Sequence, residues 1–123
     1  MEKGRGRGSY KIISFLNAFT TFRMGNHIGS RNANTFEITC YIQTTKNFVT
    51  FSELEDAVNN VVRSLTDKDL NMLPKFANKD FSVEILTEYL AVMINNELFV
   101  NGNRLVKIEV AQSPTKIFCL DFE

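Results

Sequence analysis

The sequence predicts an α+β fold in which four antiparallel strands form a sheet and two helices cover one face of it. Two strand-like stretches come first, two amphipathic helical stretches follow, and two further strand-like stretches end the chain. This order, β-β-α-α-β-β, is typical of helices segregated to one face of an antiparallel sheet. With 123 residues, of which 44% are hydrophobic, the chain is long enough for one domain with its own core.

The first half of the predicted sheet comes from residues 10–21 and 35–44. Residues 10–21 are apolar and β-branched, as strands commonly are. Residues 35–44 alternate, and their apolar face consists of Phe36, Ile38, Cys40 and Ile42. Such alternation indicates a half-buried strand. Residues 22–34 are rich in Gly, Asn and Ser, so we expect a loop there.

Two helices are predicted after these strands. Ser52 and Glu55 have the spacing of a capping box, in which a hydroxyl accepts from the first free amides of a helix. The apolar stripe of this helix is Leu54, Ala57, Val58, Val61, Val62 and Leu65. Ser82 is placed to cap the second helix. Its apolar stripe is Ile85, Leu86, Tyr89, Leu90, Met93 and Ile94.

The last two strands are predicted at residues 104–112 and 116–122. Val106, Ile108 and Val110 share one face of the first of them, and residues 113–115, Ser-Pro-Thr, form the turn between the two. Cys40 and Cys119 are far apart and each lies in a strand-like stretch. We therefore interpret both as reduced core residues.

The composition restricts the classes of partner and location. Fourteen Lys and Arg residues balance 14 Asp and Glu residues, so no net charge attracts nucleic acid or an anionic membrane. No apolar run approaches the roughly 20 residues of a membrane span, and the first residues lack the apolar region of a secretory signal. We expect a cytoplasmic protein with a disordered basic tail at residues 1–8 and a single domain at residues 9–123.

Five short strings follow one another along the chain: NANTF at 32–36, VTFSEL at 49–54, LTDKDLN at 65–71, FSVEI at 81–85 and IEVAQS at 108–113. They resemble, in the same order, the strings HGHSY, VxDFxxL, LDHxxLN, PTxEN and VxVxET of the 6-pyruvoyl and 6-carboxy-tetrahydropterin synthase family. The resemblance covers nearly the whole chain after the tail. It implies the tunnelling fold, whose sheets close into a barrel by oligomerisation, and a lyase or synthase activity on a pterin.

The resemblance also implies a zinc ion held by three histidines, but the matching positions here are Phe19, Asn32 and Asn34. Amide oxygens are poor zinc ligands and a phenyl ring is none, so we expect neither zinc nor another cofactor. The single histidine of the chain, His27, lies between these positions and cannot build such a site alone.

The family's catalytic thiol falls at about Ile28, and its activating Asp-His pair falls on Thr66 and Asp67. Thiolate chemistry needs a thiol in contact with a base, so it is not expected here. Asp67 and Lys68 are then the candidates for any remaining catalysis.

The family anchors its pterin with the glutamate of the string VxVxET, and Gln112 stands at that position. A carboxylate accepts two parallel N–H bonds, whereas an amide offers one acceptor and one donor, which suits a ring edge with N–H beside C=O. Ser82, Glu84 and Ser113 are the other ligand-binding candidates. The alternatives are that Gln112 binds nothing and that Glu84 serves the helix dipole.

Three functions stay open after this comparison. The protein is a non-catalytic homo-oligomer that binds a flat pterin-like or purine-like heterocycle, a metal-independent enzyme that acts on such a ring, or an inactive partner subunit. We prefer the first, because the residues of the family's chemistry are replaced. Neither a membrane nor a nucleic acid is an expected partner.

Overall fold

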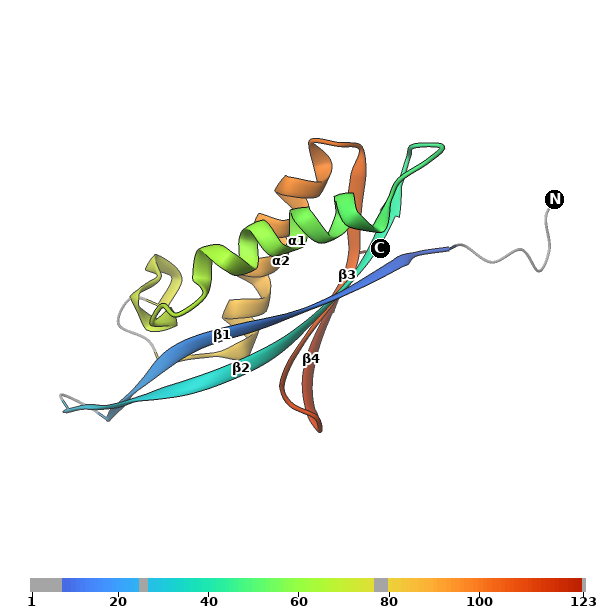
Figure 1. Cartoon of the computed structure of the whole chain (residues 1–123). Coiled ribbons are helices and arrows are strands. Elements are labelled where there is room, and N and C mark those ends of the chain that lie inside the picture. The colour runs from blue at the N-terminus through green and yellow to red at the C-terminus, as the bar shows by residue number, and fades with distance from the viewer. Residues whose placement is uncertain (1–7, 25–26, 77–79, 123) are drawn as a thin grey trace.

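The computed structural model describes residues 8–24, 27–76 and 80–122, without the side chains of residues 22–24, 27, 28 and 30. In this part of the chain, four strands form one antiparallel sheet in the order β1-β2-β3-β4. The strands are β1 (Tyr10–Met24), β2 (His27–Thr44), β3 (Asn103–Ser113) and β4 (Lys116–Asp121). The helices α1 (Phe51–Leu65) and α2 (Val83–Phe99) lie on one face of the sheet (Figure 1). The predicted fold class is confirmed.

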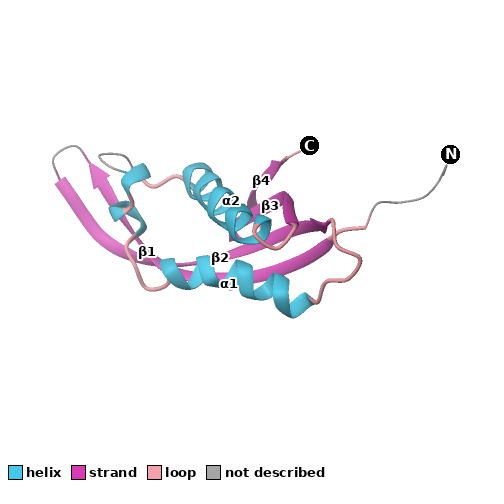
Figure 2. Ribbon diagram, turned by 90° about the horizontal axis from the view of Figure 1, so that it is seen from above, coloured by secondary structure: helices cyan, strands magenta, loops and turns pink. Residues whose placement is uncertain are grey.

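The two helices are joined by two short 3-10 turns, η1 (Leu70–Met72) and η2 (Pro74–Phe76). Seen from above, α1 runs along β1, while α2 lies over β3 and β4 (Figure 2). Of the helices in the described part of the chain, none is long and apolar enough to cross a membrane. The predicted tail falls almost entirely outside the described residues, and the division at residue 9 stays a prediction.

β1 and β2 form a longer hairpin than the sequence predicts. The loop expected at residues 22–34 is wrong for most of its length, because β1 continues to Met24 and β2 begins at His27. Pairs such as Ala18–Asn34 and Thr20–Asn32 extend the ladder past the last β2–β3 pair, Glu37–Ala111. Cross-strand pairing thus overrides the weak strand propensity of Asn and Gly.

The N-cap of α1 lies two residues before the predicted one, Ser52. Thr50 is the N-cap, and its Oγ1 accepts from the amide of Glu53 at 3.1 Å. Thr50 and Glu53 have the same capping-box spacing as Ser52 and Glu55, so the sequence offers two starts. The earlier start places the Phe51 ring edge-on against Tyr10, with 5.3 Å between the ring centroids.

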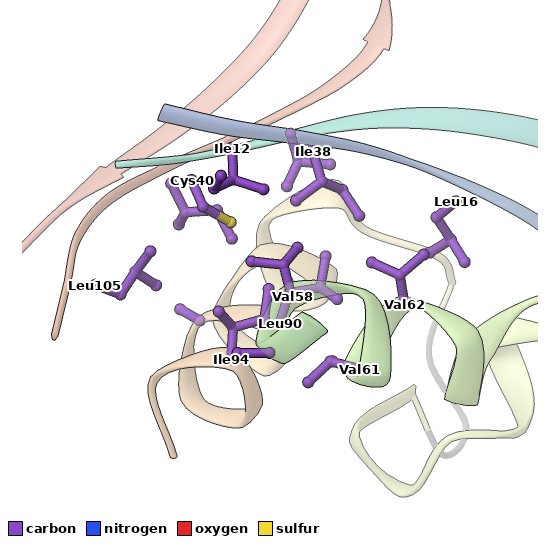
Figure 3. Packing of buried hydrophobic residues seen from close by; sticks show 14 of the residues in the cluster. Ile12, Leu16, Ile38, Cys40, Val58, Val61, Val62, Leu90, Ile94 and Leu105 are labelled. Carbon is purple, nitrogen blue, oxygen red and sulfur yellow. The ribbon is translucent and has the colours of Figure 1, made fainter. Parts of the chain in front are cut away.

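The core lies between the sheet and the two helices (Figure 3). All six residues of the predicted α1 stripe are buried, as are Val106, Ile108 and Val110 of β3. The α2 stripe needs one correction: Met93 is 38% exposed, while Ala91 and Leu98 are buried. α2 is apolar around most of its circumference, so its sequence alone does not determine the face that packs on the sheet.

Cys119 corrects the interpretation of both cysteines as core residues. Cys40 is fully buried, but Cys119 is exposed. Cys119 pairs with Glu109, and the odd-numbered residues of β3 and β4 at this level face away from the helices. Burial raises the pKa of the Cys40 thiol to about 12. Both cysteines are free thiols.

Candidate functional site

Asn32 and Asn34, at two of the family's zinc positions, lie on β2 in the far half of the hairpin. They pair with Thr20 and Ala18 of β1, so all four side chains share the face that the helices cover. The Asn34 Nδ2 donates to Thr20 Oγ1 at 2.8 Å and to the Asn32 carbonyl at 3.1 Å. An amide can offer a metal only its oxygen, which is a poor ligand for zinc, so the pair does not fit a zinc site.

Phe19, at the third zinc position, points to the opposite face of the hairpin. It pairs with Ala33, and the guanidinium of Arg31 lies 4.2 Å from its ring centroid. The structure therefore brings Asn34 together with Thr20 and not with Phe19. Of the described residues, no three His, Cys, Asp or Glu side chains group so as to hold a metal. The side chains of His27 and Ile28 lie outside the described residues.

Asp67 and Lys68 lie in the loop after α1, which runs along the outer edge of β1. The amide of Asp67 donates to the Asn17 carbonyl at 2.8 Å, and the amide of Phe19 donates to the Lys68 carbonyl at 2.8 Å. Asp67 has a left-handed backbone with φ 64°, as residues just after a helix often do. Both side chains are exposed. The structure thus gives these two residues a backbone role at the strand edge.

Ser82 and Glu84 form the start of α2. Ser82 Oγ accepts from the amide of Ile85 at 3.3 Å and donates to Glu84 Oε1 at 3.0 Å. The serine is therefore the N-cap, as predicted, and the glutamate is an exposed residue of the first turn. A carboxylate there is favoured by the helix dipole, whether or not a ligand is present.

Gln112 and Ser113 lie at the end of β3, where the β3–β4 register shifts between Ala111 and Ser113. Gln112 is the extra residue at this bulge, and it is exposed. Ser113 Oγ is buried and has no hydrogen-bond partner among the described residues. Bulges re-aim side chains and are common beside functional sites. The bulge thus presents one amide side chain and one unpartnered hydroxyl side by side in the chain.

The four ligand-binding candidates lie at the start of α2 and at the end of β3. α2 leads through residues 100–102 into β3, and the two elements pack together in opposite directions. The end of β3 therefore lies toward the start of α2. Gln112 and Ser113 are brought to the same end of this layer as Ser82 and Glu84, whereas Asp67 and Lys68 lie across the sheet at the β1 edge.

A polar cluster that the sequence analysis did not single out lies on the helix-free face of the sheet. Glu109 is its centre: it accepts from the Tyr41 hydroxyl at 3.4 Å and from Cys119 Sγ at 3.8 Å, and Lys107 Nζ lies 3.5 Å away. Desolvation and the Glu109 carboxylate raise the pKa of the Cys119 thiol, so this thiol is a poor nucleophile. The alternation in residues 35–44 and 104–112 would have placed Tyr41 and Glu109 on this face.

The Asp121 and Glu109 carboxylates raise the pKa of Lys107. Its ammonium also lies 5.4 Å from the centroid of the Tyr41 ring, and Lys11 approaches the same ring at 5.6 Å. The cluster thus holds two cations and two carboxylates around one aromatic ring.

Comparison with known proteins shows which family and which solved structures the chain resembles. The family profile of 6-pyruvoyl tetrahydropterin synthase matches residues 32–121. No curated protein matches the chain by sequence. Among solved structures, the chain resembles 6-pyruvoyl tetrahydropterin synthase from Caenorhabditis elegans, with TM-score 0.72, 10% identity and coverage of 94% of this chain and 96% of that one. It also resembles the Plasmodium vivax synthase, with TM-score 0.66, 11% identity and coverage of 95% and 99%.

An uncharacterized protein from Wolinella succinogenes is similar as well, with TM-score 0.56, 11% identity and coverage of 95% of this chain and 100% of that one. At such identities the structural likeness shows the fold alone. The family profile covers more than half of the chain, and its matched range contains four strings of the predicted resemblance after the NANTF string that opens it. The protein therefore belongs to the 6-pyruvoyl tetrahydropterin synthase family.

Proposed function

We propose that this protein is a non-catalytic homo-oligomer that binds a flat pterin-like or purine-like heterocycle through Gln112. The observation that carries the proposal is the exposed amide at the β3 bulge, which stands at the position of the family's ring anchor. The family relationship and the chemistry of the side chains at the former zinc positions support it. At one of these positions, the Asn34 side-chain amide donates hydrogen bonds to Thr20 and Asn32.

The chemistry of an amide defines the ring edge that Gln112 prefers. Its Oε1 accepts one hydrogen bond and its Nε2 donates one, so it complements an N–H beside a C=O, as in oxo-purines. A glutamate would instead accept twice, from the N–H and amino groups of a pterin or guanine edge. The Ser113 hydroxyl, next in the chain, is buried without a partner among the described residues, so a ligand at Gln112 reaches it only if the bulge opens.

The test of the ring anchor is a titration of the protein with xanthine and with neopterin, followed by calorimetry. We expect Gln112→Ala to abolish binding and Gln112→Glu to reverse the preference from the oxo-purine toward the pterin. Gln43→Ala is the control, since Gln43 lies on β2 and contacts Arg104. Equal affinities for the wild type and Gln112→Ala would remove Gln112 from the site.

The non-catalytic part of the proposal is tested separately. The protein is incubated with dihydroneopterin triphosphate, with and without zinc, and bound metal and product are measured. We expect neither turnover nor stoichiometric zinc. Turnover without zinc would favour the metal-independent enzyme, with Asp67 and Lys68 as the first residues to replace. Stoichiometric zinc would contradict our reading of Asn32 and Asn34.

A further inference from the structure

A groove lies between α2 and the two strands β3 and β4, which run beside this helix (Figure 2). Its volume is about 490 Å³, and small-molecule sites commonly measure about 300–1,000 Å³. Its apolar lining is Ala91, Val92, Leu105, Leu120 and Phe122. None of the candidate residues of the ring site lines it. From Arg104 at the groove to Gln112, an extended strand covers roughly 26 Å, so the groove is a separate site.

The groove is open because β4 does not reach the beginning of β3. β4 ends at Asp121, and the amide of Phe122 donates to the Val106 carbonyl at 2.9 Å. Within the described chain, no strand continues alongside the first residues of β3 on this side. There the amide of Leu105 donates to Asn95 Oδ1 of α2 at 3.0 Å. A side chain of α2 thus takes the place of a neighbouring strand, and the space beside it is left unfilled.

The apolar lining is partly buried and partly exposed to water. Ala91 and Leu105 are buried, whereas Val92 is 57% exposed and Phe122 is 39% exposed. Val92 lies on α2 outside the set of residues that packs in the core. A ligand with an apolar body that filled the groove would remove these exposed side chains from water, which favours binding.

The polar lining consists of Glu88, Asn95, Asn96 and Arg104. Arg104 donates to Gln43 Oε1 at 3.1 Å, which uses one of the five N–H groups of its guanidinium. No carboxylate of the described residues pairs with Arg104. Asn95 accepts from the residue after Arg104 through its Oδ1, and its Nδ2 has no partner within the described chain. One end of the groove therefore offers unused hydrogen-bond donors and a positive charge.

We infer that this groove binds a small organic anion with an apolar body and a carboxylate at one end. The apolar body lies against Leu105 and Phe122, and the carboxylate accepts hydrogen bonds from Arg104 and Asn95. A charge-assisted bond to a guanidinium favours a carboxylate over a neutral head group. Glu88 precedes Asn95 by roughly two turns of α2, or about 10 Å along the helix. Its own charge therefore disfavours the reversed orientation of the ligand.

The inference goes beyond the proposed ring site and depends neither on Gln112 nor on assembly, so it is tested in the full-length protein as it occurs in solution. The probes are octanoate, 1-octanol and octylammonium, which share one alkyl chain and differ in the charge of the head group. Calorimetric titration should give saturable binding that is tightest for octanoate and weakest for octylammonium. No saturable binding of octanoate at millimolar concentration, or equal affinities for octanoate and octylammonium, would overturn the inference.

Val92→Trp tests the position of the apolar body. The larger side chain fills the groove from its exposed rim, so it should abolish the binding of octanoate and of 1-octanol. Met93→Trp is the control, because Met93 is the next residue of the same helix, is also exposed, and does not line the groove. Thermal unfolding checks that both variants are folded. Unchanged affinity of Val92→Trp for octanoate would contradict the site.

Arg104→Gln tests the contact with the carboxylate. It should weaken the binding of octanoate about tenfold, since a charge-assisted hydrogen bond is lost, and leave the binding of 1-octanol unchanged. Arg63→Gln is the matched control: Arg63 also donates to one amide oxygen, that of Asn60 at 2.7 Å, but it lies on α1. Equal losses of affinity for octanoate and 1-octanol in Arg104→Gln would overturn the assigned contact.

Proton–nitrogen correlation NMR of the wild type locates the probe without any substitution. Octanoate should shift the signals of the Leu105 backbone amide and the Asn95 side-chain amide, which are bonded to each other. The signals of Gln112 should not move. Shifts at Gln112 with none at Leu105 and Asn95 would assign octanoate to the ring site and overturn the second site, while the ring site itself would stand.

Discussion

Val61 lies on the buried side of α1 with 5% of its surface exposed, among core residues of α1 and α2 (Figure 3). Replacing it with aspartate removes a buried apolar side chain and adds a carboxyl group among apolar neighbours. Loss of valine burial costs about 1.5–3 kcal/mol. If the carboxyl group stays neutral at pH 7, raising its pKa from about 3.9 costs about 4 kcal/mol more.

The sum, about 6 kcal/mol, is close to the total stability of a small domain, which lies at about 5–15 kcal/mol. We therefore expect Val61→Asp to be largely unfolded at pH 7. The second cost has a defined pH dependence. A buried aspartate has a folded-state pKa above its unfolded value, so the penalty is small below the unfolded pKa and grows as the pH rises toward the folded one. The variant should regain much of its lost stability near pH 4.

The assay is urea unfolding followed by circular dichroism at pH 7 and pH 4. Asn60→Asp is the matched control, because Asn60 is the preceding residue of the same helix and is exposed. Its Oδ1 accepts from Arg63 at 2.7 Å, which an aspartate keeps, and its Nδ2 donates to Glu97 at 3.3 Å, which an aspartate loses. The second contact is exposed, so its loss should cost little. A Val61→Asp variant with the wild-type midpoint at pH 7 would refute the assignment of the buried face of α1.

Two further predictions concern ionisable groups outside the core. Desolvation and the Glu109 carboxylate raise the pKa of the Cys119 thiol, so Glu109→Gln should lower this pKa and accelerate alkylation of the thiol by iodoacetamide at pH 8. Glu37→Gln, on the same face, is the control. Equal alkylation rates for Glu109→Gln and wild type would exclude an effect of Glu109 on the thiol. Hydrogen bonds from Lys46 and Asn103 hold the pKa of Glu53 below its ordinary value. The stability that Glu53 contributes is therefore present above about pH 4.3 and lost as the pH falls through the lowered pKa. Glu53→Gln should then reduce the loss of stability in acid, measured by thermal unfolding from pH 6 to pH 2. An unaltered acid dependence would show that these bonds do not stabilise the ionised form.

The parts of the fold that the sequence predicts are those with a strong period. The apolar residues of α1 recur with the helical period of 3.6 residues, and those of residues 35–44 recur at every second residue. The structure buries both sets. The far half of the β1–β2 hairpin is not predictable in this way, because Asn and Gly have low strand propensity. Pairing between β1 and β2 makes this segment extended. Cys119 was misplaced for a related reason: a six-residue strand offers too few residues to identify its buried face.

The candidate site shows a similar limit. Family strings identify Gln112 and the three positions that match the family's zinc ligands, but a string does not show how two strands pair. Only the strand pairs show that Phe19 faces away from Asn32 and Asn34 and that Gln112 occupies a bulge. A bulge depends on how two strands pair, so neither strand alone predicts it. The orphaned hydroxyl of Ser113 depends on burial in the same way.

The contacts of Asn32 and Asn34, at two of the family's zinc positions, can be compared with those that hold the hairpin in place. Where a metal site contributes to folding, loss of its ligands costs stability. Here the hairpin is fastened to the loop after α1 by other bonds: Asp67 to Asn17, Phe19 to Lys68, and Thr21 Oγ1 to Asp69 Oδ2 at 2.5 Å. Neither Asn32 nor Asn34 takes part in them. Substitution at these two positions therefore leaves the bonds between the hairpin and this loop in place.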